Sequence, residues 1–339
     1  MTNEITMRRA SHNSLFLDWN KLCADNHHAS PFQQWELHDT IARHYLFFFV
    51  AKQEWPCYFV FYKGSNLLMI APLCRRYTPH GIKYVSFGAT PTIAFQDFIY
   101  SDNLSEEDML ACLQLLKAKC GEIRFYNLSH ESMLYRVLAK QGEPVRENKN
   151  VTIPIGEGYE GYYAALSKNT RQNVRTAYNR MSTDGRLWEI ELVDGRNLKR
   201  DVEKELMDVY VTRRKARYRA TSAVHEWFLR HEHFNTIAMR QLDEAKFIVL
   251  RIDGKVAAFL AGYVDENHES LLIPRLAISD EFGRYSPGVV LINESMKLLE
   301  DKLHLKFLDL SKGDEKYKTQ MGGVIIILLI LYSKIQTSI

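Results

Sequence analysis

The chain has 339 residues, of which 46% are hydrophobic and 25% are charged, and its net charge is +3. This composition is typical of a globular protein, excludes a disordered or fibrous chain, and leaves room for two domains. The small net charge gives by itself no argument for binding DNA or RNA.

The cysteines are scattered and odd in number, and no two of them have the spacing of metal ligands. We therefore expect buried, reduced thiols, no metal site and a cytoplasmic protein. The N-terminus is polar and lacks the apolar core of a signal peptide. Val324–Leu331 is apolar but much shorter than the roughly 20 residues of a spanning helix, so we expect a buried strand there and no membrane span. The five cysteines are Cys23, Cys57, Cys74, Cys112 and Cys120.

The first half of the chain predicts a helix, a β-hairpin, further strands, a second helix and a returning strand. Ser30-Pro31-Phe32 opens the first helix, since proline suits the first helical turn. Ser105, with Asp108 three residues on, is a variant of the capping box, and Gly121 ends that second helix. The predicted strands are Cys57–Tyr62, Leu67–Leu73, Gly81–Gly88, Ala94–Tyr100 and Ile123–Leu128.

The second half repeats this order. Asp253-Gly254 is a hairpin turn signal between strands at Phe247–Arg251 and Val256–Tyr263. A strand at Ser270–Ile278, a helix from Pro287 and a strand at Lys306–Leu310 follow, and a crossover helix makes its two flanking strands parallel. We therefore predict an α/β protein with two related mixed-sheet domains, residues 1–150 and 151–339.

The loop before Pro287 is a candidate binding site. Gly283 and Gly288 let the backbone approach a ligand, and free N–H groups at a helix start attract phosphate. Arg284 adds a full positive charge. An ordinary helix entry has the same composition, so both readings stay open.

Two basic segments lie elsewhere in the second half. Lys168, Arg171 and Arg175 fall on one side of a predicted helix, and residues 213–219 hold five basic side chains. Such a face is either a solvated surface or a wall for an anionic ligand, such as a phosphate-bearing cofactor, a nucleic acid or an acidic glycan. The histidines, His231 and His233 included, show no metal-ligand spacing.

The chain resembles the GNAT acyltransferase superfamily. The resemblance is closer to its two-domain branch, the acetyltransferase-like proteins of cellulose and exopolysaccharide synthesis, which are akin to the Fem peptidoglycan aminoacyltransferases. It covers about residues 25–320 and rests on the order and spacing of several short motifs. These are Pro31–Trp35, Ile70–Leu73, Leu166–Arg171, Asp253–Ala258, Tyr285–Gly288 and Asp309–Lys318.

The resemblance implies tandem GNAT-like domains with acetyl-CoA or another acyl-CoA bound where the strands 271–278 and 306–310 splay apart. The loop 281–288 would hold the pyrophosphate. This loop departs from the usual pattern of closely spaced glycines, because Arg284 and Gly288 are spaced differently. The implied cofactor-binding residues are Leu276, Ala277, Ile278, Gly283, Arg284, Tyr285, Ser286 and Gly288.

Acyl transfer to an amine needs a base, stabilisation of the carbonyl oxygen, and an acid for the leaving thiolate. Backbone N–H groups near 276–278 would hold the carbonyl oxygen. Tyr317 is the candidate acid, with packing of the loop by its ring as the alternative. Asp309, Asp314 and Glu315 are available as the base. Asp309 is the candidate, since burial between Leu308 and Leu310 could raise its pKa, or else it fixes the loop by accepting backbone hydrogen bonds.

Three further residues are candidates for substrate binding. Arg275 and Lys318 would hold an anionic substrate or phosphate, with a solvated surface position as the alternative. Asp97 lies among aromatic residues and would either face a cleft between the domains or serve a structural role.

We therefore predict an N-acyltransferase that moves an acyl group from acyl-CoA to an amino group without a metal. The acceptor would be a small molecule or glycan precursor, such as a sugar nucleotide of polysaccharide or cell-envelope biosynthesis. The first alternative is a Fem-like transferase that takes aminoacyl-tRNA as donor. The second is a catalytically silent binding or scaffold protein of polysaccharide assembly.

Overall fold

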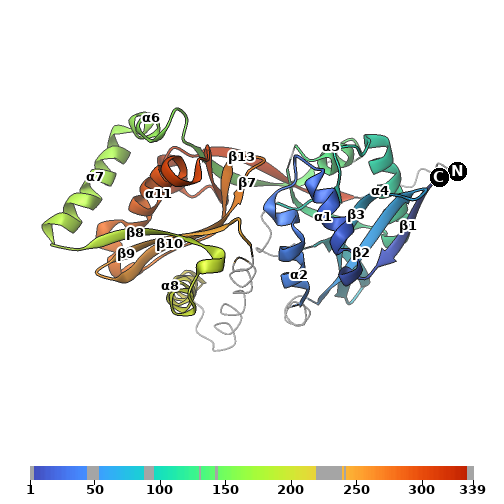
Figure 1. The fold of residues 1–339 in the computed structure, drawn as a ribbon, viewed down its shortest axis with the longest axis horizontal. Coiled ribbons are helices and arrows are strands. Elements are labelled where there is room, and N and C mark those ends of the chain that lie inside the picture. Colours follow the sequence, from blue (N-terminus) through green and yellow to red (C-terminus); the bar gives the residue numbers. More distant parts are fainter. Residues whose placement is uncertain are drawn as a thin grey trace. The chain divides into compact units, whose positions relative to one another are not determined.

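The computed structural model describes residues 4–43, 53–87, 95–129, 131–141, 144–218, 239 and 242–333. The chain divides into two compact units. Unit 1 comprises residues 1–148 and 327–339, and unit 2 comprises residues 149–326. Each unit has a mixed sheet with helices packed on it (Figure 1).

Unit 1 is built on a sheet in which consecutive strands along the chain are mostly neighbours. Its strands are β1 (Ile5–Ala10), β2 (Glu54–Lys63), β3 (Asn66–Thr78), β4 (Gly81–Ser86), β5 (Ile99–Tyr100), β6 (Ile123–Leu128) and the later part of β13 (Val324–Ser333). Its helices are α1 (Phe16–Ala24), α2 (Trp35–Arg43), α4 (Glu106–Cys120) and α5 (Met133–Ala139). The sheet order is β1-β2-β3-β4-β6-β13, with β5 on β3, and among these pairs β4 and β6 run parallel.

Most local signals in unit 1 act as predicted, but Ser30-Pro31-Phe32 does not open α2. The Ser30 hydroxyl accepts from Phe32 N–H and the Gln33 side chain reaches back to Ser30 N–H, which forms a capping box on a separate 3-10 turn over Pro31–Gln33; the extended Gln34 ends this turn before α2 begins. Ser105 caps α4 by accepting from Asp108 N–H at 3.1 Å. Gly121 ends α4 with φ +69°, a conformation that favours glycine. The predicted hairpin forms as β2 and β3, which leave Lys63 opposite Asn66.

The C-terminal tail departs from expectation. It forms a strand, β13, as predicted, but residues 327–339 belong to unit 1 and not to the second domain, because β13 pairs antiparallel with β6. The start of β13 is also not buried, since Val324, Ile325 and Ile327 are 57%, 43% and 45% exposed. The tail thus begins in one unit and ends in the other.

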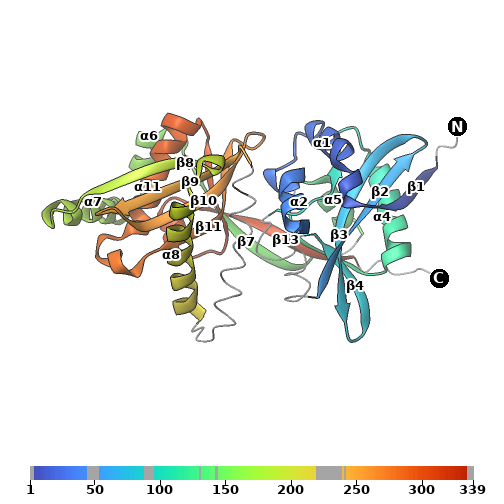
Figure 2. The same cartoon turned by 60° about the horizontal axis from the view of Figure 1, so that its bottom comes forward.

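Unit 2 has a second mixed sheet, with α8 on one face and α6, α7 and α11 on the other (Figures 1 and 2). Its strands are β7 (Pro144–Pro154), which begins in unit 1, β8 (Trp188–Asp194), β9 (Ala245–Ile252), β10 (Lys255–Asp265), β11 (Ser270–Ile278) and β12 (Phe307–Lys312). Its helices are α6 (Tyr159–Ala165), α7 (Lys168–Thr183), α8 (Arg200–Tyr218), α11 (Pro287–Leu298) and α12 (Lys316–Gln320). The sheet order is β7-β12-β11-β10-β9-β8, in which β11 and β12 run parallel.

The sequence signals in unit 2 also act locally. Asp253 and Gly254 adopt φ +50° and +76° in the turn between β9 and β10, as this hairpin turn requires. Pro287 occupies the first turn of α11, as predicted. The α11 face carrying Ile292 and Met296 packs into a large core with α7 and the sheet.

Some predictions fall on residues that are not described. His231 and His233 lie outside the described residues, as does the end of the basic segment beyond Tyr218 and residue 94 at the start of the predicted strand 94–100. Of that strand only β5 is a strand among the described residues. The five cysteines are unpaired, and only Cys23 is not buried. Within the described ranges no helix combines the length and apolarity needed to cross a membrane.

Candidate active site

The parallel strands β11 and β12 separate partway along their length. Their pairing runs only from Ser270 opposite Phe307 to Leu272 opposite Asp309. On its other edge β11 stays paired with β10 as far as Ile278. In the part of the chain that the structure describes, no strand therefore covers the outer edge of residues 273–278. N–H and C=O groups alternate between the two edges of a strand, so alternate residues of this segment direct backbone groups toward the edge that no described strand covers.

A bulge explains why the strands separate. Tyr263 lies opposite Leu272 and Ala261 opposite Arg275, so Ile273 and Pro274 together face the single residue between them on β10. Proline has no N–H to give to a ladder and is tolerated in sheets at bulges and edges. The residue opposite is Gly262, where a Cβ would lie 2.5 Å from the Leu272 carbonyl oxygen.

The bulge also shifts which side chains face α11. The core on the α11 side contains Leu271 and Ile273 before the bulge and is packed by Leu276 and Ile278 after it. The period of two is broken by one residue, as a bulge requires. Arg275 is consequently directed to the opposite face, under α8, where its guanidinium lies 4.3 Å from the Tyr210 ring centre.

The loop from β11 to α11 closes the open end of this splay. It is a 3-10 turn over Asp280–Tyr285, and Ser286 then adopts φ +49° before Pro287 starts the helix. Val289 and Val290 N–H both donate to the Ser286 carbonyl, and Pro287 has no N–H. Among the described residues the Gly288 N–H therefore has no acceptor, and it is the free donor of this helix start.

Gly288 is held close to the end of β11. A Cβ at this position would lie 2.6 Å from Cδ1 of Ile278. A larger residue would displace that side chain rather than enter the ligand space, which differs from the simple expectation that glycine leaves room for pyrophosphate. Gly283 has no atom within 4 Å of an added Cβ, and neither glycine needs a positive φ.

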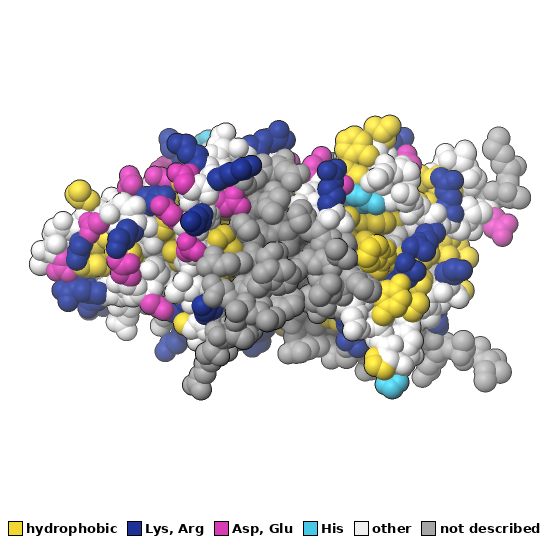
Figure 3. All heavy atoms as spheres, turned by 90° about the horizontal axis from the view of Figure 1, so that it is seen from below, with side chains coloured by type: hydrophobic (Ala, Val, Ile, Leu, Met, Phe, Trp, Pro, Cys, Tyr) yellow, Lys and Arg dark blue, Asp and Glu magenta, His cyan; other side chains and the backbone are white. Residues whose placement is uncertain are grey.

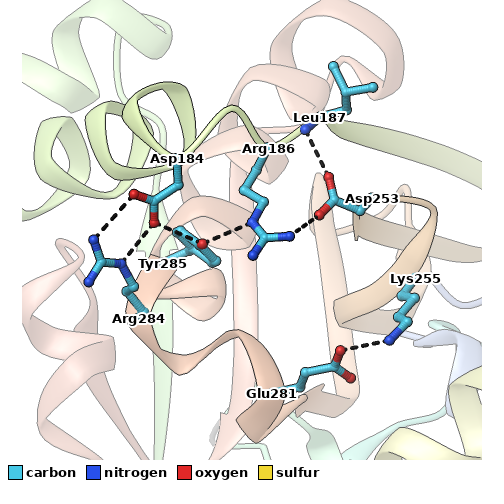
Figure 4. A network of polar contacts seen from close by, with 8 residues as sticks. All are labelled: Asp184, Arg186, Leu187, Asp253, Lys255, Glu281, Arg284 and Tyr285. Atoms are coloured by element: carbon cyan, nitrogen blue, oxygen red, sulfur yellow. Dashed lines mark hydrogen bonds and ion pairs between the residues drawn. The ribbon is translucent and has the colours of Figure 1, made fainter.

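Figure 4 shows a chain of ion pairs that fastens this loop to α7 and to the β9–β10 turn. Asp184, at the end of α7, accepts from Arg284 Nε at 2.9 Å and from the Tyr285 hydroxyl at 2.9 Å. Arg186 donates to the Tyr285 hydroxyl at 3.1 Å and to Asp253 at 2.7 Å. The pKa of Asp184 lies below its usual value, and the hydrogen bond from the Arg284 guanidinium is the largest cause. These partners come from three separate parts of the chain.

Within β12 the pairing with β7 shifts register between Asp309 and Lys312, and the backbone bends there. The Asp309 carboxylate accepts from Ser311 N–H at 2.6 Å and from the Thr152 hydroxyl at 3.0 Å, while Ser311 adopts φ +54°. Burial raises the pKa of Asp309 to about 6, against these hydrogen bonds and the charge of Lys318, which lower it. The carboxylate thus holds the backbone at Ser311, which was the second of the two predicted roles.

Lys318 on α12 is buried beneath the same bend. Its ammonium donates to the carbonyl oxygens of Leu310, Lys312 and Gly313 at 2.9, 2.7 and 3.1 Å, and it lies 3.1 Å from a Glu315 carboxylate oxygen. Only 4% of Lys318 is exposed. The expectation that Lys318 holds a substrate or phosphate is therefore corrected, because its donors are already used by the backbone.

The comparisons with known proteins agree with this geometry. Residues 168–319, which contain the splay and both turns, match the acetyltransferase (GNAT) domain family. They are a GNAT acetyltransferase domain. No curated protein matches the sequence.

Solved structures resemble the whole chain. FemX superposes with a TM-score of 0.61 at 10% identity over 96% of this chain and 97% of its own. The C-terminal domain of a putative lysylphosphatidylglycerol synthetase from Agrobacterium fabrum gives 0.56 at 13%, covering 94% and 92%. A tandem GNAT protein from the clavulanic acid pathway gives 0.54 at 8%, covering 99% and 100%. At these identities the likeness concerns the fold, which is the tandem, Fem-like form of the GNAT fold.

Most of the predicted residues lie within the GNAT domain. Leu276, Ala277 and Ile278 line the uncovered edge of β11, and the loop 283–288 adjoins its end. Tyr317 lies half-buried on α12, packed against the core beside the β12 turn. Arg275 is 7% exposed on the α8 face, so it is not a surface cation.

Asp97 lies apart from the GNAT domain, in unit 1. Its carboxylate accepts from Phe98 N–H at 2.7 Å and from the Tyr100 hydroxyl at 3.0 Å. Burial raises the pKa of Asp97 to about 7. These contacts give it the structural role that was the alternative at the sequence level.

Sequence reasoning missed three residues of this site. Pro274 was available as a signal, because a proline inside an apolar strand marks a bulge or an edge. Once the register of β10 and β11 is known, the position of the Pro274 bulge identifies Gly262 as the residue opposite it. Asp184 carried no signal, since it meets Arg284 from a position one hundred residues away in the chain.

The pairing of Arg284 leads to a prediction about the loop. We expect Arg284→Ala to weaken CoA binding by about two- to five-fold, because it removes an exposed tether of the loop. Asp184→Ala should weaken it at least as much, because Asp184 also accepts from the Tyr285 hydroxyl, and the double variant should be no weaker than Asp184→Ala, as measured by calorimetry. If Arg284 instead contacts phosphate directly, Arg284→Ala alone will weaken binding, and Asp184→Ala will leave it unchanged or tighter.

Proposed function

We propose that unit 2 transfers an acyl group from acyl-CoA, such as acetyl-CoA, to an amine. The observation that carries this proposal is the separation of β11 from β12 at the Pro274 bulge. It leaves a row of backbone donors where a thioester carbonyl can lie. The free Gly288 N–H at the end of the same splay supports binding of the pyrophosphate there.

The reaction assigns a role to each neighbouring group. The amine attacks the thioester carbonyl carbon, and N–H groups from residues 276–278 stabilise the developing oxyanion. Asp309, with its pKa near 6, accepts the proton that the amine loses. The carbon–sulfur bond then breaks, and the thiolate takes a proton from the Tyr317 hydroxyl. Arg275, buried beside this site, would position α8 rather than bind the substrate directly.

The acceptor is proposed from the resemblance to polysaccharide-linked acetyltransferases. An amino group on a sugar nucleotide or another glycan precursor fits that resemblance. A panel of amino sugars and nucleotide-linked amino sugars, scored by release of free CoA, identifies the acceptor.

One observation favours a second candidate, an aminoacyl-tRNA donor. Helix α7 contains no acidic residue, and its Lys168 and Arg175 side chains are exposed. Arg171 is partly turned inward, where it donates to the carbonyls of Ala164 and Leu166. The remaining cations could follow a phosphate backbone.

Calorimetry with CoA and with tRNA at several salt concentrations separates the two donors. If acyl-CoA is the donor, CoA should bind at micromolar concentration with a modest salt dependence. Affinity for tRNA falls by nearly one power of salt concentration for each phosphate contacted, so a steep slope marks a tRNA donor. Salt-steep tRNA binding without CoA binding would replace the first proposal by the second. Binding of neither donor would leave the scaffold alternative.

The proposed base predicts a specific pH profile. Because only the ionised carboxylate accepts a proton, kcat/KM should rise with pH up to about 6 and then level off. Asp309→Asn should remove this limb and lower kcat/KM by roughly 10²–10⁴-fold. A steady-state pH series on both proteins measures this.

Thr152→Val provides the matched control. It keeps the side-chain shape but removes a hydrogen bond that lowers the pKa of Asp309, so the limb should move to higher pH with the plateau retained. An unmoved limb in Thr152→Val, or a limb that survives in Asp309→Asn, would assign Asp309 to shaping the turn alone.

A further inference from the structure

The long β3–β4 hairpin of unit 1 has an unusual charge pattern. Residues 55–96 contain no Asp or Glu. The hairpin itself carries Arg75, Arg76 and Lys83, with His80 in its turn. Figure 2 shows β3 and β4 extending as a hairpin. The cations of this segment therefore lie mostly at the end of the hairpin and no acidic residue of the segment offsets them, although the protein as a whole is nearly neutral.

One face of the hairpin end is apolar and exposed. Tyr77 pairs with Ile82 across β3 and β4, and Trp55 on β2 pairs with Arg75 on the same face. Trp55, Tyr77 and Ile82 are 40%, 37% and 50% exposed. Figure 3 shows hydrophobic side chains next to Lys and Arg on the surface of unit 1 that it presents. Amphipathic aromatic side chains beside an aliphatic one and cations are typical of surfaces that meet the lipid headgroup region.

The opposite face of the hairpin contains a cavity of about 240 Å³. Its walls include Arg76, Lys83 and Arg124, with Thr78 and Val85 between them. A water molecule in the liquid takes up about 30 Å³, so the cavity has room for a phosphate group with its first substituent atoms. Cationic side chains around such a space select an oxyanion.

The charges of this cavity suit a singly charged ligand. Arg76 is paired with the buried Glu54, and Arg124 donates to the Tyr126 hydroxyl at 3.3 Å. Glu122 is the acidic residue of the lining. Arg76, Lys83 and Arg124 carry three positive charges, and Glu54 and Glu122 carry two negative ones. The remaining net charge of +1 would be balanced by a phosphodiester.

We propose that this hairpin docks unit 1 on an anionic lipid surface, with a lipid headgroup phosphate in the cavity and Tyr77 and Ile82 in the interfacial region. The cavity and the apolar pair lie on opposite faces of the same hairpin end, so both meet the headgroup layer when the hairpin enters it end first. A free phosphate would account for the cavity alone. A lipid accounts for both, since an exposed isoleucine gains nothing from a small soluble anion.

Flotation with vesicles of phosphatidylcholine, with and without phosphatidylglycerol, tests the proposal. The full chain should float with the anionic vesicles, less so at high salt, and not with phosphatidylcholine alone. Lys83→Glu changes two units of charge and should reduce partitioning by about 30-fold. Ile82→Ser, at a half-exposed position, should reduce it by about five-fold.

Two variants in unit 2 serve as matched controls. Lys302→Glu makes the same charge change at an exposed site, and Leu187→Ser removes an 80% exposed leucine. Both should float like the wild type, and circular dichroism checks that every variant is folded. Equal loss from Lys302→Glu and Lys83→Glu would overturn the proposal, since only net charge would then matter. Binding of inorganic phosphate without flotation, or equal flotation with both kinds of vesicle, would overturn it as well.

Discussion

Replacing Lys318 by methionine is expected to lower the free energy of unfolding of unit 2 by about 3–5 kcal/mol, the range found when a buried charge network is broken. Methionine keeps much of the aliphatic stem but removes the ammonium. The carbonyls of residues 310–313 and the Glu315 carboxylate then lose their common donor. Urea denaturation followed by circular dichroism measures the change.

The neighbouring Lys316→Met variant is the control for this measurement. Lys316 is exposed on the same short helix, so its replacement should change stability by no more than about 0.5 kcal/mol. Equal effects from the two variants would show that the buried ammonium is not what holds the turn. Because the turn also carries Asp309, we expect Lys318→Met to reduce activity even under conditions where it stays folded.

Tyr317→Phe is expected to lower kcat by roughly 10²–10⁴-fold, the range for loss of a general acid. The ring remains to pack against the core, so CoA affinity and stability should be nearly unchanged. Single-turnover kinetics with saturating acetyl-CoA measure the chemical step directly.

Tyr163→Phe is the matched control, because Tyr163 is also half-buried against the same core and its hydroxyl donates to the Arg171 carbonyl at 3.4 Å. Its rate should equal that of the wild type. Full turnover by Tyr317→Phe would remove only the proposed acid, and the thiolate would then leave unassisted or with a proton from water.

The sequence by itself determined the elements whose causes are local. Asp253-Gly254 sets a tight turn because both residues accept a positive φ, and Ser105 caps a helix through a neighbour three residues away. Pro287 begins α11 because proline lacks an N–H, and an N–H in the first helical turn has no acceptor within the helix. The succession of hairpin, strand, helix and returning strand in each half followed from such signals, and it was enough to predict the mixed α/β fold.

The tertiary structure decided everything that depends on a distant partner. A lysine reads as a surface residue, yet Lys318 is buried because the turn after β12 supplies several carbonyl acceptors. Arg284 reads as a phosphate ligand, yet the end of α7 brings Asp184 to it. The last strand joins unit 1 because β6 offers an edge for it. Each of these outcomes depends on which backbone or charged groups remain unpaired once the sheets have formed, and residue type alone does not contain that information.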